Sequence, residues 1–127
     1  QSYHQLGGNK VQARTQVAAA QLIQDAIALE SAGVFALVLE AVPTIAARDV
    51  TAAINIPTIG IGAGPHCDGQ VLVSADLLGL HDRHSPKFVK RYADLQAQIT
   101  SAAERFMAEV DGGVYPSPEQ SYNWSLK

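Results

Sequence analysis

The sequence predicts an α/β fold built from parallel βαβ units, and three observations support this class. Helical patterns alternate with short apolar strands along the chain. The run 34–39 holds six apolar residues without alternation, which is typical of a strand buried on both faces. Only three such strands can be placed in 127 residues, too few to provide each other with neighbours and covering helices. We therefore expect the C-terminal part of a larger α/β barrel or open sheet.

The first helix is expected over about 14–32, where apolar residues recur every three or four positions. Gly33 follows, and glycine favours the left-handed conformation in which helices often end. The apolar run 34–39 is the first expected strand, and Glu40 is the first charged residue after it. The order predicts a helix that leads directly into a buried strand.

The same pattern then repeats. Thr44 can cap a helix that runs to about residue 53, and a second strand is expected over 58–61. This strand opens into the glycine-rich turn 62–65, and a third strand is expected over 69–74.

The C-terminal third predicts one long helix. A short turn near 77–79 and a loop over 81–86 precede it, and Pro86 suits the first turn of a helix. Tyr92 and Phe106 share the apolar stripe of this helix and could reach a partner subunit. We expect one domain with a lead-in segment over 1–13, three βα units over 14–86, the helix over 87–111 and a tail over 112–127.

Composition excludes several classes of protein. With 9 Lys and Arg, 12 Asp and Glu and a net charge of −3, the chain has no basic excess for binding nucleic acid. A hydrophobic fraction of 47% argues against a disordered tail. The longest apolar run, 34–39, is far shorter than a membrane span, and the polar residues 1–10 do not have the pattern of a signal peptide, so neither feature is expected. The single cysteine, Cys67, fits a reducing compartment, so a cytoplasmic location is expected.

Glu40 is the most informative single residue. A carboxylate at the C-terminal end of a buried parallel strand lies where α/β folds place their chemistry. A partly desolvated carboxylate there can act as a general base. The alternative is that Glu40 faces solvent at the start of a loop or pairs with an arginine.

The turn 60–64 has glycine at every second position, and such a turn can bring backbone N–H groups close to a phosphate. The lysine of a P-loop is missing, and Pro65 offers no N–H. A tight turn that leaves room for a ligand or a neighbouring side chain is the favoured interpretation, and a phosphate-binding barrel stays the alternative.

Two further clusters contain residue types that occur in functional sites. The adjacent residues 66–68 (His, Cys, Asp) cannot all point at one ion from regular structure, so a metal site is not expected there. Ser74 and Asp76 could place a hydroxyl and a carboxylate at the end of the third strand, but Asp76 more simply caps the turn that follows.

Six blocks of sequence, in order, resemble the ketopantoate hydroxymethyltransferase family. The resemblance covers essentially the whole chain from residue 1 to residue 122, which makes it far more specific than any one glycine motif. The blocks are Gly7–Gln12, Ala36–Pro43, Ile56–Gly64, Asp68–Val73, Pro86–Lys90 and Tyr115–Pro116.

The resemblance implies a (β/α)8 barrel that transfers a hydroxymethyl group from 5,10-methylenetetrahydrofolate to 3-methyl-2-oxobutanoate in pantothenate biosynthesis. It implies Mg²⁺ bound by the 2-oxo acid and a large homo-oligomer, a decamer. The family's general base matches Glu40. The chain would hold strands six to eight, so the metal ligands would lie in the N-terminal part of the barrel and none in this chain. The isolated chain is then expected to be inactive.

Strand alternation adds a smaller expectation. Val71 and Val73 share one face of the third strand, and Ile61 ends the second, so these three could form an apolar wall for the isopropyl group of the substrate. Ordinary core packing is the alternative for each. Asn9, Ala41 and Ala75 depart from the family pattern. A non-catalytic barrel fragment that serves oligomerisation is the remaining alternative for the whole chain.

Overall fold

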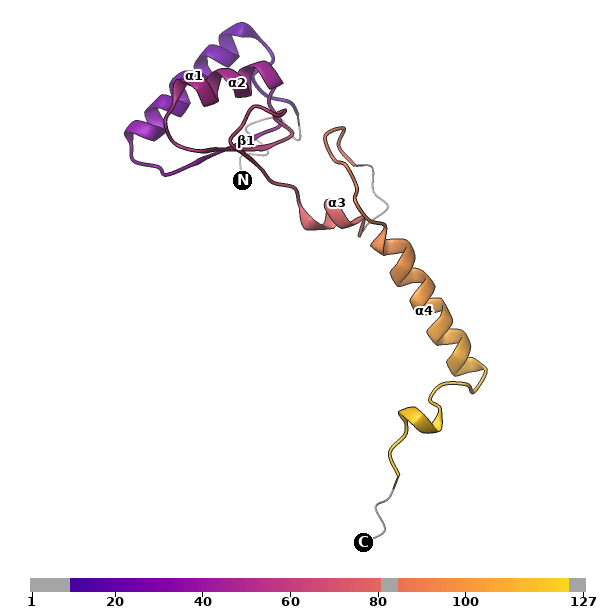
Figure 1. Ribbon diagram of the computed structural model, residues 1–127. Helices are drawn as coiled ribbons and strands as arrows, with labels where there is room; N and C mark the ends of the chain where they lie inside the picture. The colour runs from indigo at the N-terminus through magenta and orange to yellow at the C-terminus, as the bar shows by residue number, and fades with distance from the viewer. Residues whose placement is uncertain (1–9, 81–84, 124–127) are drawn as a thin grey trace. The chain divides into compact units, whose positions relative to one another are not determined.

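Figure 1 shows the computed structural model of the chain, which describes residues 10–80 and 85–123. The chain divides into two compact units, Gln1–Val73 with Pro86–Val89 and Ser74–Ser85 with Lys90–Lys127. Asn9 and most of the predicted loop 81–86 lie outside the described residues.

The first helix, α1, spans Gln16–Ser31 and confirms the predicted helix within two residues at each end. Thr15 begins it, because its hydroxyl accepts a hydrogen bond from the N–H of Ala18 at 3.2 Å. Gly33 follows the last turn with φ +90°, so the predicted glycine stop is also confirmed.

Three parallel strands form the sheet in the order β1-β2-β3. They are β1 (Leu37–Glu40), β2 (Thr58–Ile61) and β3 (Gly69–Gln70), and α2 (Thr44–Ala53) connects the first two. The prediction of parallel βαβ organisation is thereby confirmed, and β2 has the predicted bounds.

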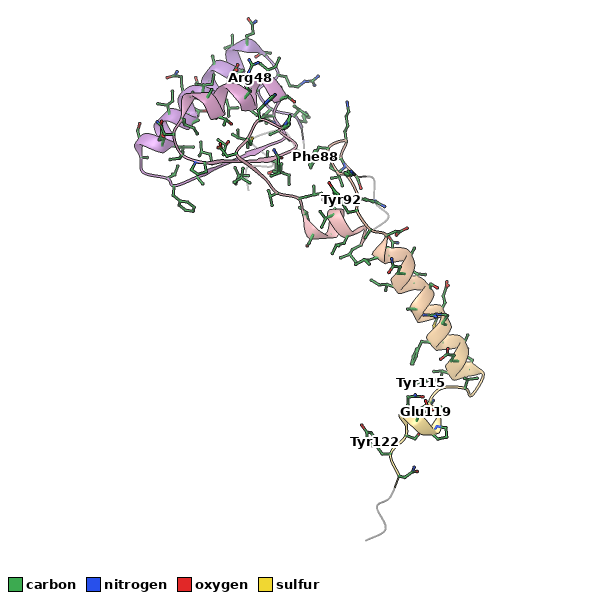
Figure 2. All side chains as sticks on the ribbon, viewed as in Figure 1. Arg48, Phe88, Tyr92, Tyr115, Glu119 and Tyr122 are labelled. Atoms are coloured by element: carbon green, nitrogen blue, oxygen red, sulfur yellow. The ribbon has the colours of Figure 1, made fainter. Side chains whose placement is uncertain are left out.

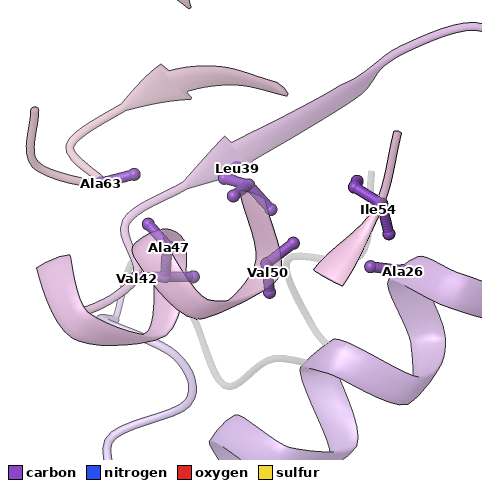
Figure 3. Packing of buried hydrophobic residues seen from close by; sticks show 7 residues of the cluster. All are labelled: Ala26, Leu39, Val42, Ala47, Val50, Ile54 and Ala63. Carbon is purple, nitrogen blue, oxygen red and sulfur yellow. The ribbon is translucent and has the colours of Figure 1, made fainter. Parts of the chain in front are cut away.

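One face of the sheet carries the core of the first unit. The helices α1 and α2 pack against each other over β1, as Figures 1 and 3 show. Small and branched side chains fill the space between these layers, which lets the helices approach the sheet closely. The buried cluster consists of Ala26, Leu39, Val42, Ala47, Val50, Ile54 and Ala63.

The prediction that the first strand is buried on both faces is wrong for this chain. The strand begins at Leu37, three residues later than expected. Phe35 is 90% exposed and Val38 is 64% exposed, whereas Leu39 belongs to the core. The reason is that α1 and α2 cover one face only, and no described element covers the face that bears Val38.

Local details of the next elements also differ from expectation. Pro43, not Thr44, occupies the N-cap of α2, and no side chain caps that helix. The third strand is two residues long instead of six, because its pairing with β2 ends at Gln70, and α3 (Ser74–Leu78) begins where the predicted strand ends. Asp76 lies in the first turn of α3.

In the second unit, α4 spans Leu95–Asp111 and so begins eight residues later than the predicted start at residue 87. Asp94 sets this start, since its carboxylate accepts the N–H of Ala97 at 3.2 Å. Tyr92 precedes the helix, and its N–H bonds to the carbonyl of Leu77 at 2.9 Å. Helix α4 ends before Gly112 and Gly113, as predicted.

Pro86 likewise does not begin a helix, because its carbonyl accepts the N–H of Val89 in an isolated turn. The tail contains one short 3₁₀ helix, η1 (Pro118–Gln120), capped by Ser117. Tyr115 packs edge-on against Phe106 of α4, with ring centroids 5.2 Å apart, and Tyr115 is labelled in Figure 2. Among the described residues, no helix is long and apolar enough to cross a membrane.

Candidate functional site

Glu40 is the last residue of β1, at the C-terminal end of the strand, and its side chain is exposed. In the parallel register it lies opposite Ile61, the last residue of β2. Paired residues in a sheet direct their side chains to the same face. Glu40 and Ile61 therefore share the face that α1 and α2 leave uncovered.

Val71 extends this row to the third strand. Its N–H donates to the carbonyl of Gly60 at 3.0 Å, which continues the β2–β3 pairing one residue beyond β3. By the alternation of the strand, Val71 falls on the same face as Ile61. Val71 is 49% exposed, and Val73, two residues further on, is 53% exposed. The structure thus brings Glu40, Ile61 and Val71 into one row, and Val73 follows at the end of this unit.

Glu40 also lines a cavity of about 480 Å³ between β1, α1 and the segment that precedes α1. A second carboxylate, Asp25 of α1, lines the same cavity and accepts a hydrogen bond from Nε2 of Gln21 at 2.8 Å. Val38 and Leu39 of β1, which point to opposite faces of the strand, and Leu22 of α1 also line this hollow.

The backbone turns sharply directly after Glu40. Ala41 has φ +51°, in the left-handed region that non-glycine residues rarely adopt. Its N–H donates to the carbonyl of Ile61 and its carbonyl accepts the N–H of Gln12, both at 2.9 Å. These two hydrogen bonds hold the strained residue in place, and strain of this kind is common beside functional groups.

The glycine-rich turn is closely packed. A β-carbon on Gly62, at φ +65°, would lie 2.6 Å from Cδ1 of Phe88, a residue labelled in Figure 2. A β-carbon on Gly64, at φ +79°, would lie 2.7 Å from Cγ2 of Thr44. The glycines therefore make room for neighbouring side chains, as the favoured interpretation of this turn anticipated.

The residues 66–68 diverge from one another. His66 is exposed, Cys67 packs against the core, and Asp68 bonds to Thr58. The N–H of Thr58, followed by its hydroxyl, holds the pKa of Asp68 below the ordinary aspartate value of 3.8. Within residues 10–80 and 85–123, no three His, Cys, Asp or Glu side chains gather closely enough to hold a metal ion.

Comparison with known proteins identifies the family. Residues 1–118 match the family described as ketopantoate hydroxymethyltransferase. The chain belongs to this family. The resemblance seen in the six sequence blocks is thereby confirmed.

Curated relatives named 3-methyl-2-oxobutanoate hydroxymethyltransferase agree with this assignment. The one from Heliobacterium modesticaldum is 57% identical over 122 residues, which is 96% of this chain and 44% of the relative. The relative from Citrifermentans bemidjiense is 53% identical over 122 residues, 96% of this chain and 46% of its own length. The relative from Pelobacter propionicus is 52% identical over 123 residues, which is 97% of this chain and 45% of the relative. The chain therefore spans less than half the length of the curated relatives it matches.

The sequence analysis did not predict several residues that the structure places at the candidate site. Asp25 and Gln21 form an i,i+4 pair on the polar side of α1, and this spacing is a sequence signal for such a hydrogen bond. Gln12 and Ala41 carried no signal, because their contact joins backbone atoms of distant segments.

Proposed function

We propose that this chain supplies strands six to eight of a (β/α)8 barrel that transfers a hydroxymethyl group to 3-methyl-2-oxobutanoate. Glu40 is the proposed general base. The observation that carries this proposal is the place of Glu40 at the C-terminal end of β1, in a row with Ile61 and Val71. In barrels of this class, residues at the C-terminal ends of the strands carry the chemistry.

The reaction begins with removal of the proton on C3 of the oxo acid by the Glu40 carboxylate. The electron pair of that C–H bond passes into the enolate of the adjacent keto group. C3 then bonds to the methylene carbon of 5,10-methylenetetrahydrofolate, and both C–N bonds of that carbon break. Water supplies the hydroxyl group of the product. The remaining proton of water and the proton held by Glu40 pass to the two folate nitrogens, so the products are 2-dehydropantoate and tetrahydrofolate and Glu40 is again a carboxylate. A positioned carboxylate typically contributes a factor of about 10²–10⁴ to such a proton transfer.

Apolar side chains in the row would receive the isopropyl group of the substrate. Val71 and Val73 are about half exposed, and Ile61 lies beside the carboxylate. A branched alkyl group that covers these three side chains would remove apolar surface from water. We propose this contact as the source of selectivity for a 3-methyl substituent.

The Mg²⁺ that the family resemblance implies does not fit the described residues, which offer no cluster of three ligands. We therefore derive no step through the metal and propose that its ligands lie in the N-terminal portion that the relatives contain. That portion is also the proposed partner of the uncovered face of β1. A homo-oligomer and a cytoplasmic location remain predictions.

The proposal is tested in a chimaera that joins this chain to the N-terminal part of the Heliobacterium relative. Exchange of the C3 proton of 3-methyl-2-oxobutanoate in heavy water, followed by NMR, reports deprotonation without the folate. Glu40→Gln should slow this exchange by a factor of about 10²–10⁴. Glu104→Gln, the same chemical change on the exposed helix α4, serves as the matched control.

Two outcomes would contradict the proposal. Exchange at nearly the normal rate in Glu40→Gln removes this residue from the role of base. A chimaera that folds but neither exchanges the proton nor forms product favours the alternative of a non-catalytic fragment. The 127-residue chain alone is expected to be inactive, so turnover by that chain would refute the need for an N-terminal portion.

A further inference from the structure

The connection between β2 and β3 is unusually short. Ile61 ends β2 and Gly69 begins β3, so only residues 62–68 link them, and they contain no helix. Parallel neighbours usually need a crossover of about a dozen residues or more. In addition, β3 is only two residues long. Some contact other than a crossover helix must therefore hold β3 beside β2.

Asp68 provides that contact. One carboxylate oxygen, Oδ2, accepts the N–H of Thr58 at 2.8 Å and the hydroxyl of Thr58 at 2.9 Å. The N–H of Asp68 in turn donates to the Thr58 hydroxyl at 3.2 Å. We call these three hydrogen bonds between Asp68 and Thr58 the clasp.

The inner end of the clasp is fixed in the core. Thr58 is completely buried, and its hydroxyl lies 2.9 Å from that of Thr51 on α2. The depressed pKa of Asp68 agrees with an ionised carboxylate that receives strong hydrogen bonds. Thr58 is the buried member of the pair, and its N–H would be costly to leave without this acceptor, whereas the Asp68 carboxylate itself is exposed.

The clasp lies at the point that determines the register of the third strand. It sits directly before the pair Ile59–Gly69, after which Gly60 pairs with Gln70 and Val71 bonds to Gly60. Because side chains alternate along a strand, a slip of one residue would replace Val71 on the face that bears Glu40 with Gln70 in one direction and with Leu72 in the other.

We propose that Asp68 is a positioning residue, which fixes the register of β3 through the clasp and thereby places Val71 in the row with Ile61 and Glu40. The clasp itself follows from the geometry alone. Only its effect on the oxo acid rests on the proposed function.

Two measurements test this inference. Amide hydrogen exchange at Val71, made on the 127-residue chain, reports the bond to Gly60. The kinetics of the chimaera report the effect on the substrate. Asp68→Ala and Thr58→Val should both speed exchange at Val71. Both should also raise KM for 3-methyl-2-oxobutanoate, on the order of tenfold, with a much smaller change in kcat, because an apolar contact is lost while the base remains.

Matched variants separate the clasp from general damage. Thr58→Ser keeps the hydroxyl and should behave like the unaltered protein. Asp49→Ala removes another exposed carboxylate of the same unit, one paired with Arg48, and should change neither measurement. If Asp68→Ala does not fold, Asp68→Asn, which keeps one carbonyl acceptor, is measured in the same way and should show a smaller effect of the same kind.

The results distinguish the two proposals. Unchanged exchange at Val71 in both clasp variants overturns the inference, whatever the activity. Faster exchange together with equal losses in kcat and kcat/KM would mean that Asp68 contributes only to the stability of the fold, and this result also overturns the inference. If the unaltered chimaera lacks activity while exchange at Val71 responds as expected, the proposed function fails and the register role of Asp68 stands.

Discussion

Replacing Gly64 by alanine should lower the free energy of unfolding by about 2–5 kcal/mol. Gly64 has φ +79°, and an L-residue pays about 1–2 kcal/mol in that region. The new methyl group would also lie 2.7 Å from Cγ2 and 2.9 Å from Cβ of Thr44, and closer still to its hydroxyl. Overpacking against a residue held in a helix adds about 1–3 kcal/mol.

Gly33→Ala is the matched control for this substitution. Gly33 has φ +90°, but a β-carbon there would meet nothing within 4 Å. It should therefore show only the backbone cost of about 1–2 kcal/mol. Urea unfolding of the 127-residue chain measures both variants. Thr44→Ala, combined with Gly64→Ala, should restore part of the loss because it removes the nearest side-chain atoms. Equal losses for Gly64→Ala and Gly33→Ala would refute the contact with Thr44.

Two further predictions concern the core and the clasp. Val50 is fully buried between α2 and the sheet, so Val50→Ala should cost about 2–3 kcal/mol in urea unfolding, from lost apolar contact and the remaining cavity. A loss below about half a kcal/mol would show that the site is not packed. The pKa of Asp68 is lowered in the folded chain, so its stabilising effect is complete above pH 3.8 and is lost as pH falls through the lower folded value. Asp68→Asn should therefore flatten the acid dependence of unfolding below pH 3.8, and an unchanged acid profile would contradict the clasp.

The sequence was most informative where local signals mark both ends of an element. Pro57 and Gly62 bracket β2, and its predicted bounds are those observed. Gly33 marks the end of α1, because glycine readily adopts the left-handed conformation in which helices often end. Such signals act within a few residues, so one chain without further information is enough to find them.

Elements whose bounds depend on distant partners were predicted less well. Phe88 and Tyr92 have helical spacing with the apolar residues of α4, yet both precede the helix. The N–H of Tyr92 bonds instead to Leu77, a contact that periodicity cannot reveal. The predicted length of β3 was wrong for a similar reason. Pairing with β2, and not the length of the apolar run, decides where this strand ends.

The same distinction between local signals and distant contacts applies to the candidate site. The position of Glu40 at a strand end was predicted, since a change from apolar to charged residues marks such an end. The row with Ile61 and Val71 needed the register, which the sequence does not specify. The left-handed conformation of Ala41 could not be predicted, because alanine has no preference for it and only bonds to distant backbone atoms hold it there.

The unequal faces of the sheet connect the fold to the proposed role. The face toward α1 and α2 buries Leu39 and Thr58, while the opposite face exposes Val38, Glu40 and Val71. An exposed apolar face of this kind is unfavourable in water. In a barrel, apolar side chains fill the interior and residues at the C-terminal ends of the strands carry the chemistry, so both kinds of group have a role there. Under the proposed function, this face would be covered by the portion that makes up more than half of each curated relative and that this chain does not span. In the proposed barrel, closure would create the partly dry surroundings that Glu40 needs to remove a proton from carbon, and the proposed clasp at Asp68 would keep Val71 in the row with Glu40 when closure occurs.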